Sequence, residues 1–185
     1  MTDQFEKIIR PQWSGWIIAA ALATLMVVTR LGHFGEYSAP PDASWAVFFL
    51  GGLWLRSSFA FSGFFALAFA TDLAAVAFGA PTDCFSPAYA FLVPAYGALW
   101  FAGAATDRLM RAPIAIACGA ATTFCIANLG MFLMANFSNL GAADYARAVI
   151  GYFPHYLLSM SVYVVVSVLA MAFSQRYEFA PAHRE

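Results

Sequence analysis

Residues 65–79, FALAFATDLAAVAFG, carry a single carboxylate, Asp72, inside an otherwise apolar run. The apolar stretch extends in both directions, from Phe59 to Ala80, and is long enough for a helix to cross a bilayer, which takes about 20 residues. Asp72 then lies about 12 Å from the C-terminal end of this span. Because a carboxylate at that depth is costly, we expect it to face the bundle interior or a watery cavity, next to a partner.

The composition of the whole chain agrees with a membrane location. Hydrophobic residues make up 62% of the 185 residues and charged residues 10%, where a soluble domain carries about a quarter charged residues. The apolar runs are continuous rather than alternating, which favours transmembrane helices over a β-barrel. The formal net charge of −1 argues against a nucleic-acid partner, which needs a basic face. We therefore predict an all-α integral membrane protein.

Six apolar stretches recur along the chain and predict one domain, residues 1–185, built as a bundle of six transmembrane helices. The spans are expected at about 13–29, 43–55, 59–80, 87–105, 112–135 and 150–173. The second of them is short for a span. The sequence contains no nucleotide-binding motif, soluble domain or long linker.

The distribution of positive charge predicts the orientation of the bundle. The N-terminal segment, the second and fourth connections and the C-terminal tail hold seven of the nine basic residues: Lys7, Arg10, Arg56, Arg108, Arg111, Arg176 and Arg184. The other three connections hold Arg30 and Arg147. Because cytoplasmic loops are enriched in Lys and Arg, we expect both termini in the cytoplasm and the first, third and fifth connections outside.

The third connection and the span after it, residues 81–100 (PTDCFSPAYAFLVPAYGALW), place Cys84 in a short polar gap. Ser86 and Pro87 predict a helix start, with serine as N-cap and proline in the first turn. Cys84 is then expected just outside a helix N-terminus, where the helix dipole favours the thiolate, the form that ligates metals and attacks electrophiles. The alternative is an ordinary loop cysteine.

The other two cysteines, Cys118 and Cys125, lie seven residues apart on one face of the fifth span. We interpret them as small packing residues. Neither reaches the outer loops easily, so Cys84 has no evident disulfide partner and is expected to be a free thiol facing an oxidising compartment.

Two tyrosines in the fourth span, Tyr89 and Tyr96, are seven residues apart and hence share a helical face. Tyr89 is nearer the outer surface and is the better candidate for ligand contact, whereas Tyr96 is interpreted as structural. Pro94 removes a backbone donor between them and is expected to bend the helix. The partner of Asp72 is expected among three residues that approach from the outer side: His33, Tyr89 and Arg147. A structural hydrogen bond from a protonated Asp72 is the alternative.

The run DASWAVFFLGG, residues 42–52, followed by Asp72 and by DCFSPAYAFLVPAYGALW, residues 83–100, resembles the BtuM-type vitamin B12 transporters. These are small six-helix membrane proteins related to the S-components of energy-coupling-factor transporters. The resemblance covers Arg30 to about Trp100, and over the last two helices mainly the topology agrees. It implies an S-component-like bundle in the inner membrane of a bacterium.

The resemblance also implies a ligand and a site. Cys84 is similar in position to the loop cysteine that binds the cobalt of cobalamin as an axial ligand, and a soft thiolate suits a corrin-bound cobalt. By the same resemblance His33, Asp72 and Tyr89 are expected to line the corrin pocket. An arginine late in the chain is expected there too, and we assign it to Arg147, with His155 as the alternative.

The resemblance further implies a partner, an energy-coupling module that docks on small residues of the first helix. Gly15, Ala19 and Ala23 form such a stripe, although packing within the bundle explains the stripe as well. Two other functions remain open. One is an intramembrane thiol enzyme with Cys84 as the catalytic nucleophile and Asp72 or His33 as acid–base partner, including removal of cyanide from cyanocobalamin. The other is a structural subunit of a membrane complex.

Overall fold

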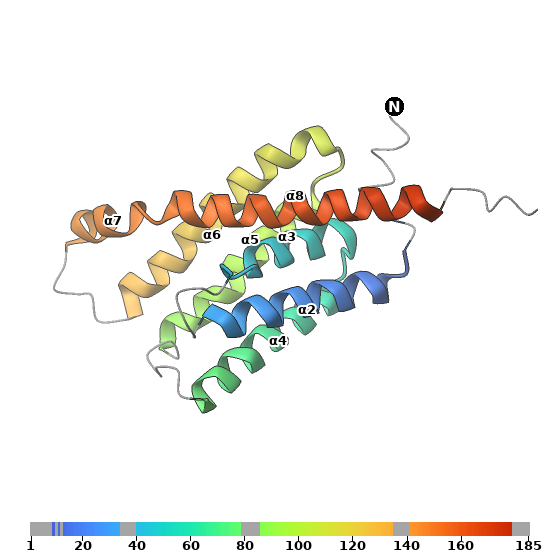
Figure 1. The fold of residues 1–185 in the computed structure, drawn as a ribbon. Helices are drawn as coiled ribbons and strands as arrows, with labels where there is room; N and C mark the ends of the chain where they lie inside the picture. The colour runs from blue at the N-terminus through green and yellow to red at the C-terminus, as the bar shows by residue number, and fades with distance from the viewer. Residues whose placement is uncertain are drawn as a thin grey trace, which may run out of the picture.

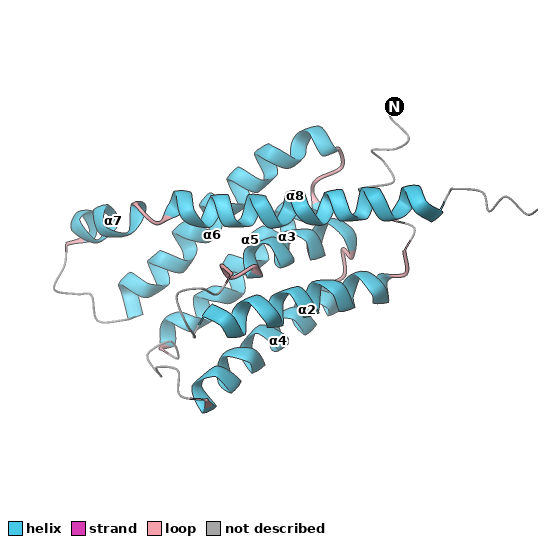
Figure 2. Ribbon diagram, in the orientation of Figure 1, coloured by secondary structure: helices cyan, strands magenta, loops and turns pink. Residues whose placement is uncertain are grey.

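Helices make up nearly all of the described chain. The computed structural model describes residues 9, 11, 13–33, 40–78, 86–134 and 141–178, with the side chains of 31–33 and 176–178 outside the description. The α-helices in these ranges are α2 (Gly15–His33), α3 (Ser44–Trp54), α4 (Ser58–Ala77), α5 (Leu92–Ala104), α6 (Ala112–Met134), α7 (Ala142–Ile150) and α8 (Phe153–Glu178). Two 3-10 turns, η2 (Pro87–Phe91) and η3 (Leu109–Arg111), directly precede α5 and α6. No strand occurs among the described residues (Figure 2), so the predicted all-α class is confirmed.

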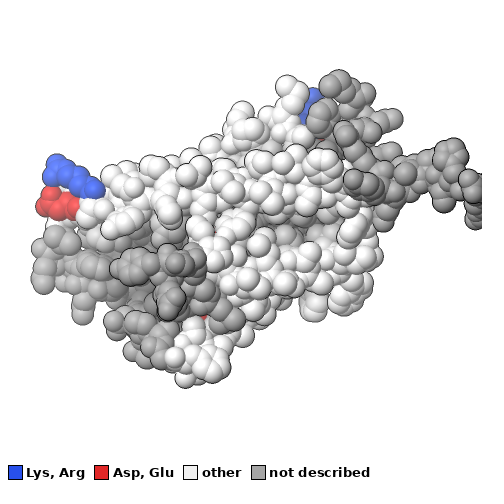
Figure 3. Space-filling view, in the orientation of Figure 1, with Lys and Arg blue, Asp and Glu red and all other residues white. Residues whose placement is uncertain are grey.

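Three helical segments are long and apolar enough to cross a membrane: Ser58–Ala77, Leu109–Met134 and Phe153–Gln175. The apolar segments Gly15–Arg30 and Ser44–Trp54 are shorter. Large apolar side chains such as Phe59, Phe101 and Leu158 are exposed on the outside of the bundle. Figure 3 shows a face with almost no charge between α7 and the opposite end. A surface of this kind is suited to lipid rather than water.

The helices run alternately in opposite directions, so at each end of the bundle the C-terminal ends of some helices lie beside the N-terminal ends of others (Figure 1). At the left end in Figure 1, α2, α4 and α6 finish and α3, α5 and α8 begin, next to α7. The opposite end holds the start of α2, the turns between α3 and α4 and between α5 and α6, and the C-terminal end of α8. We call the first of these the α7 end of the bundle.

The short helix α3 is enclosed by the rest of the bundle. Nine of its 11 residues are buried, and it contacts α2, α4, α5, α6 and α8. Its sequence is apolar on every side, which is the pattern of a helix buried all round. At the rise of an α-helix it is about 16 Å long, about half the thickness of the hydrocarbon core. The short second apolar stretch therefore forms the central helix against which the longer ones pack.

Glycines allow α3 and α5 to approach closely. A β-carbon at Gly52 would overlap the backbone carbonyl of Trp100, and a β-carbon at Gly103 would overlap the carbonyl of Phe49. Small residues at such crossings let two helix backbones approach within van der Waals contact, which is a main source of helix association in membranes. The glycines thus fix the crossing of α3 and α5, whose N-terminal ends both lie at the α7 end.

Arg56 joins the two turns at the opposite end of the bundle. Its backbone is left-handed, with a φ of 52°, and its amide donates to the carbonyl of Gly51 at 3.2 Å, which closes the C-terminal turn of α3. Its guanidinium donates to the carbonyls of Leu53 at 3.2 Å and Thr106 at 3.1 Å. The turn between α3 and α4 is thereby bound to the turn between α5 and α6.

The start of α5 differs in part from the sequence prediction. Ser86 occupies the N-cap position of η2, and Pro87 lies in its first turn, but the serine side chain makes no capping hydrogen bond. The chain makes a 3-10 turn over Pro87–Phe91 before α5 begins at Leu92. Pro94 therefore falls in the first turn of α5, where a missing N–H has no helical partner to lose. The bend was expected at Pro94 inside the span, whereas the irregular part of the span is the 3-10 turn before α5, and Pro94 stands in the first turn of that helix.

Candidate functional site

An ion pair buried between α2 and α4 forms the floor of the candidate site. Arg30 Nε donates to Asp72 Oδ1 at 2.5 Å, and Arg30 Nη2 donates to Asp72 Oδ2 at 2.6 Å. The side chains are only 8% and 4% exposed. The two parallel bonds form the bidentate geometry in which guanidinium and carboxylate pair most strongly. Leaving either charge unpaired at this buried position would lower the stability of the fold by roughly several kcal/mol. Each residue therefore requires the other.

The third guanidinium nitrogen of Arg30 connects α2 to the starts of α3 and α5. Arg30 Nη1 donates to Asp42 Oδ2 at 3.1 Å, Ser44 Oγ at 2.8 Å and Tyr96 Oη at 3.3 Å. Asp42 Oδ1 in turn accepts from the amide of Ser44 at 2.9 Å and from its hydroxyl at 2.7 Å. Asp42 therefore holds the chain in the turn that begins α3.

Tyr89 completes the network from η2. Its hydroxyl donates to Asp72 Oδ2 at 2.9 Å, so this oxygen accepts from both Tyr89 and Arg30. Both carboxylate oxygens of Asp72 thus already accept hydrogen bonds, Oδ1 from Arg30 and Oδ2 from Arg30 and Tyr89, which leaves little room for Asp72 to accept a proton from a reacting group. The arrangement argues against the predicted acid–base role of Asp72 in a thiol enzyme.

A cavity of about 530 Å³ opens above this network at the α7 end of the bundle. Small-molecule sites commonly have volumes of about 300–1,000 Å³ and combine an apolar lining with a few polar groups. The polar part of the lining consists of Arg30, Asp42, Asp72, Tyr89, Tyr96 and Asn128. The remaining part consists of Trp45, Leu92, Phe124, Ala127, Met131, Val149, Tyr152 and Tyr156. Trp45 and Tyr156, both in this lining, stack on each other with their ring centroids 5.1 Å apart.

Two of the predicted site residues, Asp72 and Tyr89, meet in this cavity, and Tyr89 is confirmed as a partner of Asp72. His33 ends α2, one helical turn after Arg30, but its side chain lies outside the described residues. Cys84, the predicted cobalt ligand, lies in segment 79–85, which is also outside the described residues. Its role as a ligand stays a prediction from the sequence.

The late-chain candidates lie apart from the cavity lining. Arg147 is exposed on α7 and donates to Asp144 on the same helix at 2.9 Å, so it is not the partner of Asp72. His155 is exposed in the first turn of α8, where its ring contacts that of Tyr156. The guanidinium on the described lining of the cavity belongs to Arg30.

The sequence analysis did not identify Arg30 and Asp42 as site residues, and it gave Tyr96 a structural role only. A signal for Arg30 was present, since an intramembrane carboxylate requires a cation and Arg30 is the basic residue at the end of the first expected span. Tyr96 combines both roles, because it accepts from Arg30 and stacks on Phe48 with centroids 4.2 Å apart. Asp42 gave no comparable signal, because it stands in a loop where acids are common.

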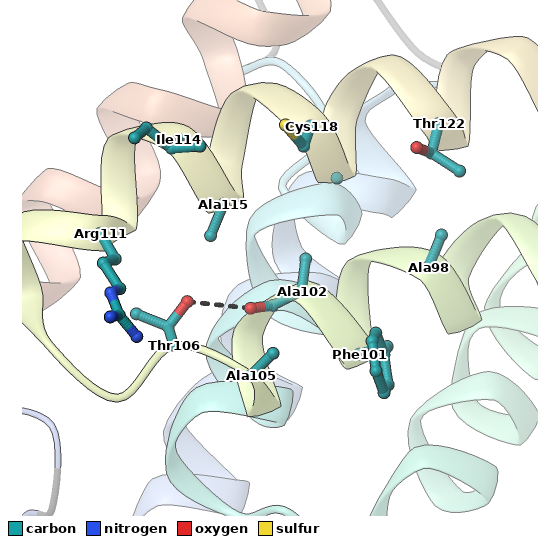
Figure 4. A pocket seen from close by; sticks show the side chains of 11 residues that line it. Ala98, Phe101, Ala102, Ala105, Thr106, Arg111, Ile114, Ala115, Cys118 and Thr122 are labelled. Atoms are coloured by element: carbon teal, nitrogen blue, oxygen red, sulfur yellow. Dashed lines mark hydrogen bonds between the residues drawn. The ribbon is translucent and has the colours of Figure 1, made fainter.

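A second cavity, of about 570 Å³, lies between α5 and α6 and is shown in Figure 4. Its lining is mainly small and apolar, and two of its polar members are already engaged: Thr106 donates to the carbonyl of Ala102, and Arg111 pairs with Asp107. Cys118 lines it, and both Cys118 and Cys125 are free thiols exposed on α6. Because its described lining has fewer polar and charged groups to orient a ligand, this groove is a weaker candidate than the first cavity.

The stripe Gly15, Ala19 and Ala23 lies on α2. Ala19 and Ala23 are partly buried against the core of the bundle, and a β-carbon at Gly15 would lie 3.8 Å from Leu55. Packing within the bundle therefore explains this stripe. The docking of a coupling module there stays a prediction.

No known protein-family model matches the chain, and no curated protein sequence matches it significantly. The functional argument therefore depends on the residues and the geometry described above.

Proposed function

We propose that this chain binds a corrinoid, cobalamin (vitamin B12), in the cavity at the α7 end and carries it into the cytoplasm. The observation that supports the proposal best is the cavity itself, which combines the Arg30–Asp72–Tyr89 network with the aromatic rings of Trp45 and Tyr156. A rigid, flat ring system with polar substituents fits such a lining. The resemblance of residues 42–52 and 83–100 to BtuM-type transporters names the ligand.

In this proposal Cys84 coordinates the cobalt as a thiolate. Cys84 comes two residues before Ser86 in the sequence, and Ser86 precedes the η2 turn, in which Tyr89 donates to Asp72. A soft thiolate is a suitable axial ligand for a corrin-bound cobalt and would displace a ligand such as cyanide. His33, at the end of α2, belongs to the proposed pocket on the same resemblance. Arg147, which the resemblance also implied, pairs with Asp144 and does not line the described cavity.

The proposal includes six membrane crossings in the inner (cytoplasmic) membrane of a bacterium, with both termini in the cytoplasm and the α7 end outside. This orientation follows from the distribution of Lys and Arg between the connections. The chain carries no nucleotide-binding motif, so an ATP-driven step requires a separate coupling module. Gly15, Ala19 and Ala23 remain the proposed contact of that module.

The visible spectrum of bound cobalamin tests the cobalt ligand. Wild-type protein purified after growth with cobalamin is expected to carry a corrin band shifted from that of the free vitamin, because a thiolate replaces the upper ligand. Cys84→Ala is expected to lose the shift. Cys125→Ala is the matched control, since Cys125 is a free thiol exposed on α6, and its spectrum is expected to equal that of the wild type. An unchanged shifted band in Cys84→Ala rejects cysteine coordination, and a colourless wild type rejects the proposed ligand.

A further inference from the structure

The described cavity lining holds more negatively charged than positively charged side chains. Three of these lining residues are charged, Arg30, Asp42 and Asp72, so one cation faces two carboxylates. The other arginine near this end, Arg147, is neutralised by Asp144 on α7 and does not belong to the lining. The described lining therefore carries an excess of one negative charge.

Arg30 has little capacity left to receive an anionic ligand. Its Nε and Nη2 atoms donate to Asp72, and its Nη1 donates to Asp42, Ser44 and Tyr96. Its side chain is 8% exposed. A ligand carboxylate in the cavity would thus meet a cation that is buried and already paired.

Asp42 is the more accessible of the two carboxylates. Its side chain is 26% exposed, against 4% for Asp72. Its oxygens accept from Arg30 and Ser44, and a carboxylate has about four acceptor positions, so capacity for a ligand N–H remains. An amide of the ligand can donate to Asp42, whereas a carboxylate of the same shape cannot donate and is repelled.

Resting on the proposed function, we infer that the cavity selects corrinoids whose peripheral groups are amides and rejects those with a carboxylate at the buried edge, with Asp42 as the specificity-determining residue. The excess negative charge of Asp42 and Asp72 over Arg30 carries the inference. The distinction is chemically narrow, because an amide and a carboxylate have nearly the same shape and differ in charge and in donors.

The three monocarboxylates of cobalamin, in each of which one propionamide of the ring is hydrolysed to the acid, are matched probes for this inference. Binding to purified protein at neutral pH is measured for cobalamin and for each acid. At least one acid is expected to bind about tenfold more weakly than cobalamin, a difference of about 1.4 kcal/mol. The position of the affected propionamide then identifies the edge of the corrin that lies next to Asp42.

Two variants are expected to change the ratio of cobalamin binding to acid binding in opposite directions. Asp42→Asn removes the excess charge and is expected to bring the binding of that acid close to that of cobalamin. Asn128→Asp adds a carboxylate to the lining from α6 and is expected to widen the difference, which keeps the test informative if Asp42→Asn does not fold. Asp107→Asn, at the opposite end of the bundle, is the matched control and should leave the ratio unchanged.

The outcomes separate this inference from the proposed function. If wild-type protein binds no cobalamin, the proposed function is wrong and the inference fails with it. If cobalamin and all three acids bind equally, or if folded Asp42→Asn and Asn128→Asp leave the ratio unchanged, the charge selection is wrong and the proposed ligand stands.

Discussion

A guanidinium inside an apolar bundle stabilises the fold only if carboxylates and hydroxyls surround it, because the loss of its hydration is otherwise uncompensated. Arg30 satisfies this condition with four residues from three places in the chain: Asp72 on α4, Asp42 and Ser44 at the start of α3, and Tyr96 on α5. One side chain therefore sets the relative positions of α2, α3, α4 and α5 at the α7 end. The same side chain forms part of the cavity floor.

Replacing Arg30 tests this role directly. Arg30→Met leaves Asp72 buried without its cation and is expected to lower the free energy of unfolding by about 3–5 kcal/mol. Arg30→Lys keeps the charge but loses the planar fork that reaches Asp72 and Ser44 together, so an intermediate loss is expected. The measurement is the apparent melting temperature in detergent.

The control for the Arg30 series is Arg111→Lys, because Arg111 pairs with Asp107 on the exposed surface and such pairs contribute about 0–1 kcal/mol. Adding Asp72→Asn to Arg30→Met should recover part of the lost stability, since it removes the uncompensated charge. Equal melting temperatures for wild type and Arg30→Met would contradict the central position of this ion pair.

At the scale of the element, α3 and α5 meet through glycine, and the closeness of this contact has a measurable consequence. Gly103→Ala places a β-carbon against the carbonyl of Phe49 and is expected to lower the free energy of unfolding by about 1–3 kcal/mol, or to separate the helices. Gly97→Ala is the matched control on the same helix, because nothing lies within 4 Å of its β-carbon position. This control should be neutral or stabilising by about 1 kcal/mol. Similar melting temperatures for the two variants would rule out the close crossing.

The helices themselves were predictable because their lengths follow from the apolar runs. The expected span at 112–135 corresponds to α6, Ala112–Met134, and the span at 59–80 corresponds to α4, Ser58–Ala77. The start of α5 was harder to predict, since the choice between a 3-10 turn and an α-helix around Pro94 depends on packing. The need for a cation beside Asp72 could be read from the sequence, but its assignment to Arg30 could not, because the pairing depends on which helices become neighbours.

For the whole molecule, the alternating helices place the cavity and α7 at one end and the basic turns at the other. Arg56, Arg108 and Arg111 all belong to these turns, which gives the bundle an unequal distribution of positive charge. Because positive loops stay on the cytoplasmic side, the α7 end and the mouth of the cavity are expected outside the cell membrane. This orientation is what uptake of a ligand from outside requires.

Cysteine labelling of the two ends tests the orientation. In a chain whose Cys84, Cys118 and Cys125 are replaced by serine, Asp144→Cys and Asp107→Cys each add one thiol at an exposed position, on α7 and at the opposite end respectively. A membrane-impermeant maleimide should label the first variant in intact spheroplasts and the second only after permeabilisation. Labelling of both in detergent confirms that the thiols are reactive. The reversed pattern would invert the bundle, and labelling of both variants in intact spheroplasts would contradict an odd number of membrane crossings between α5 and α7.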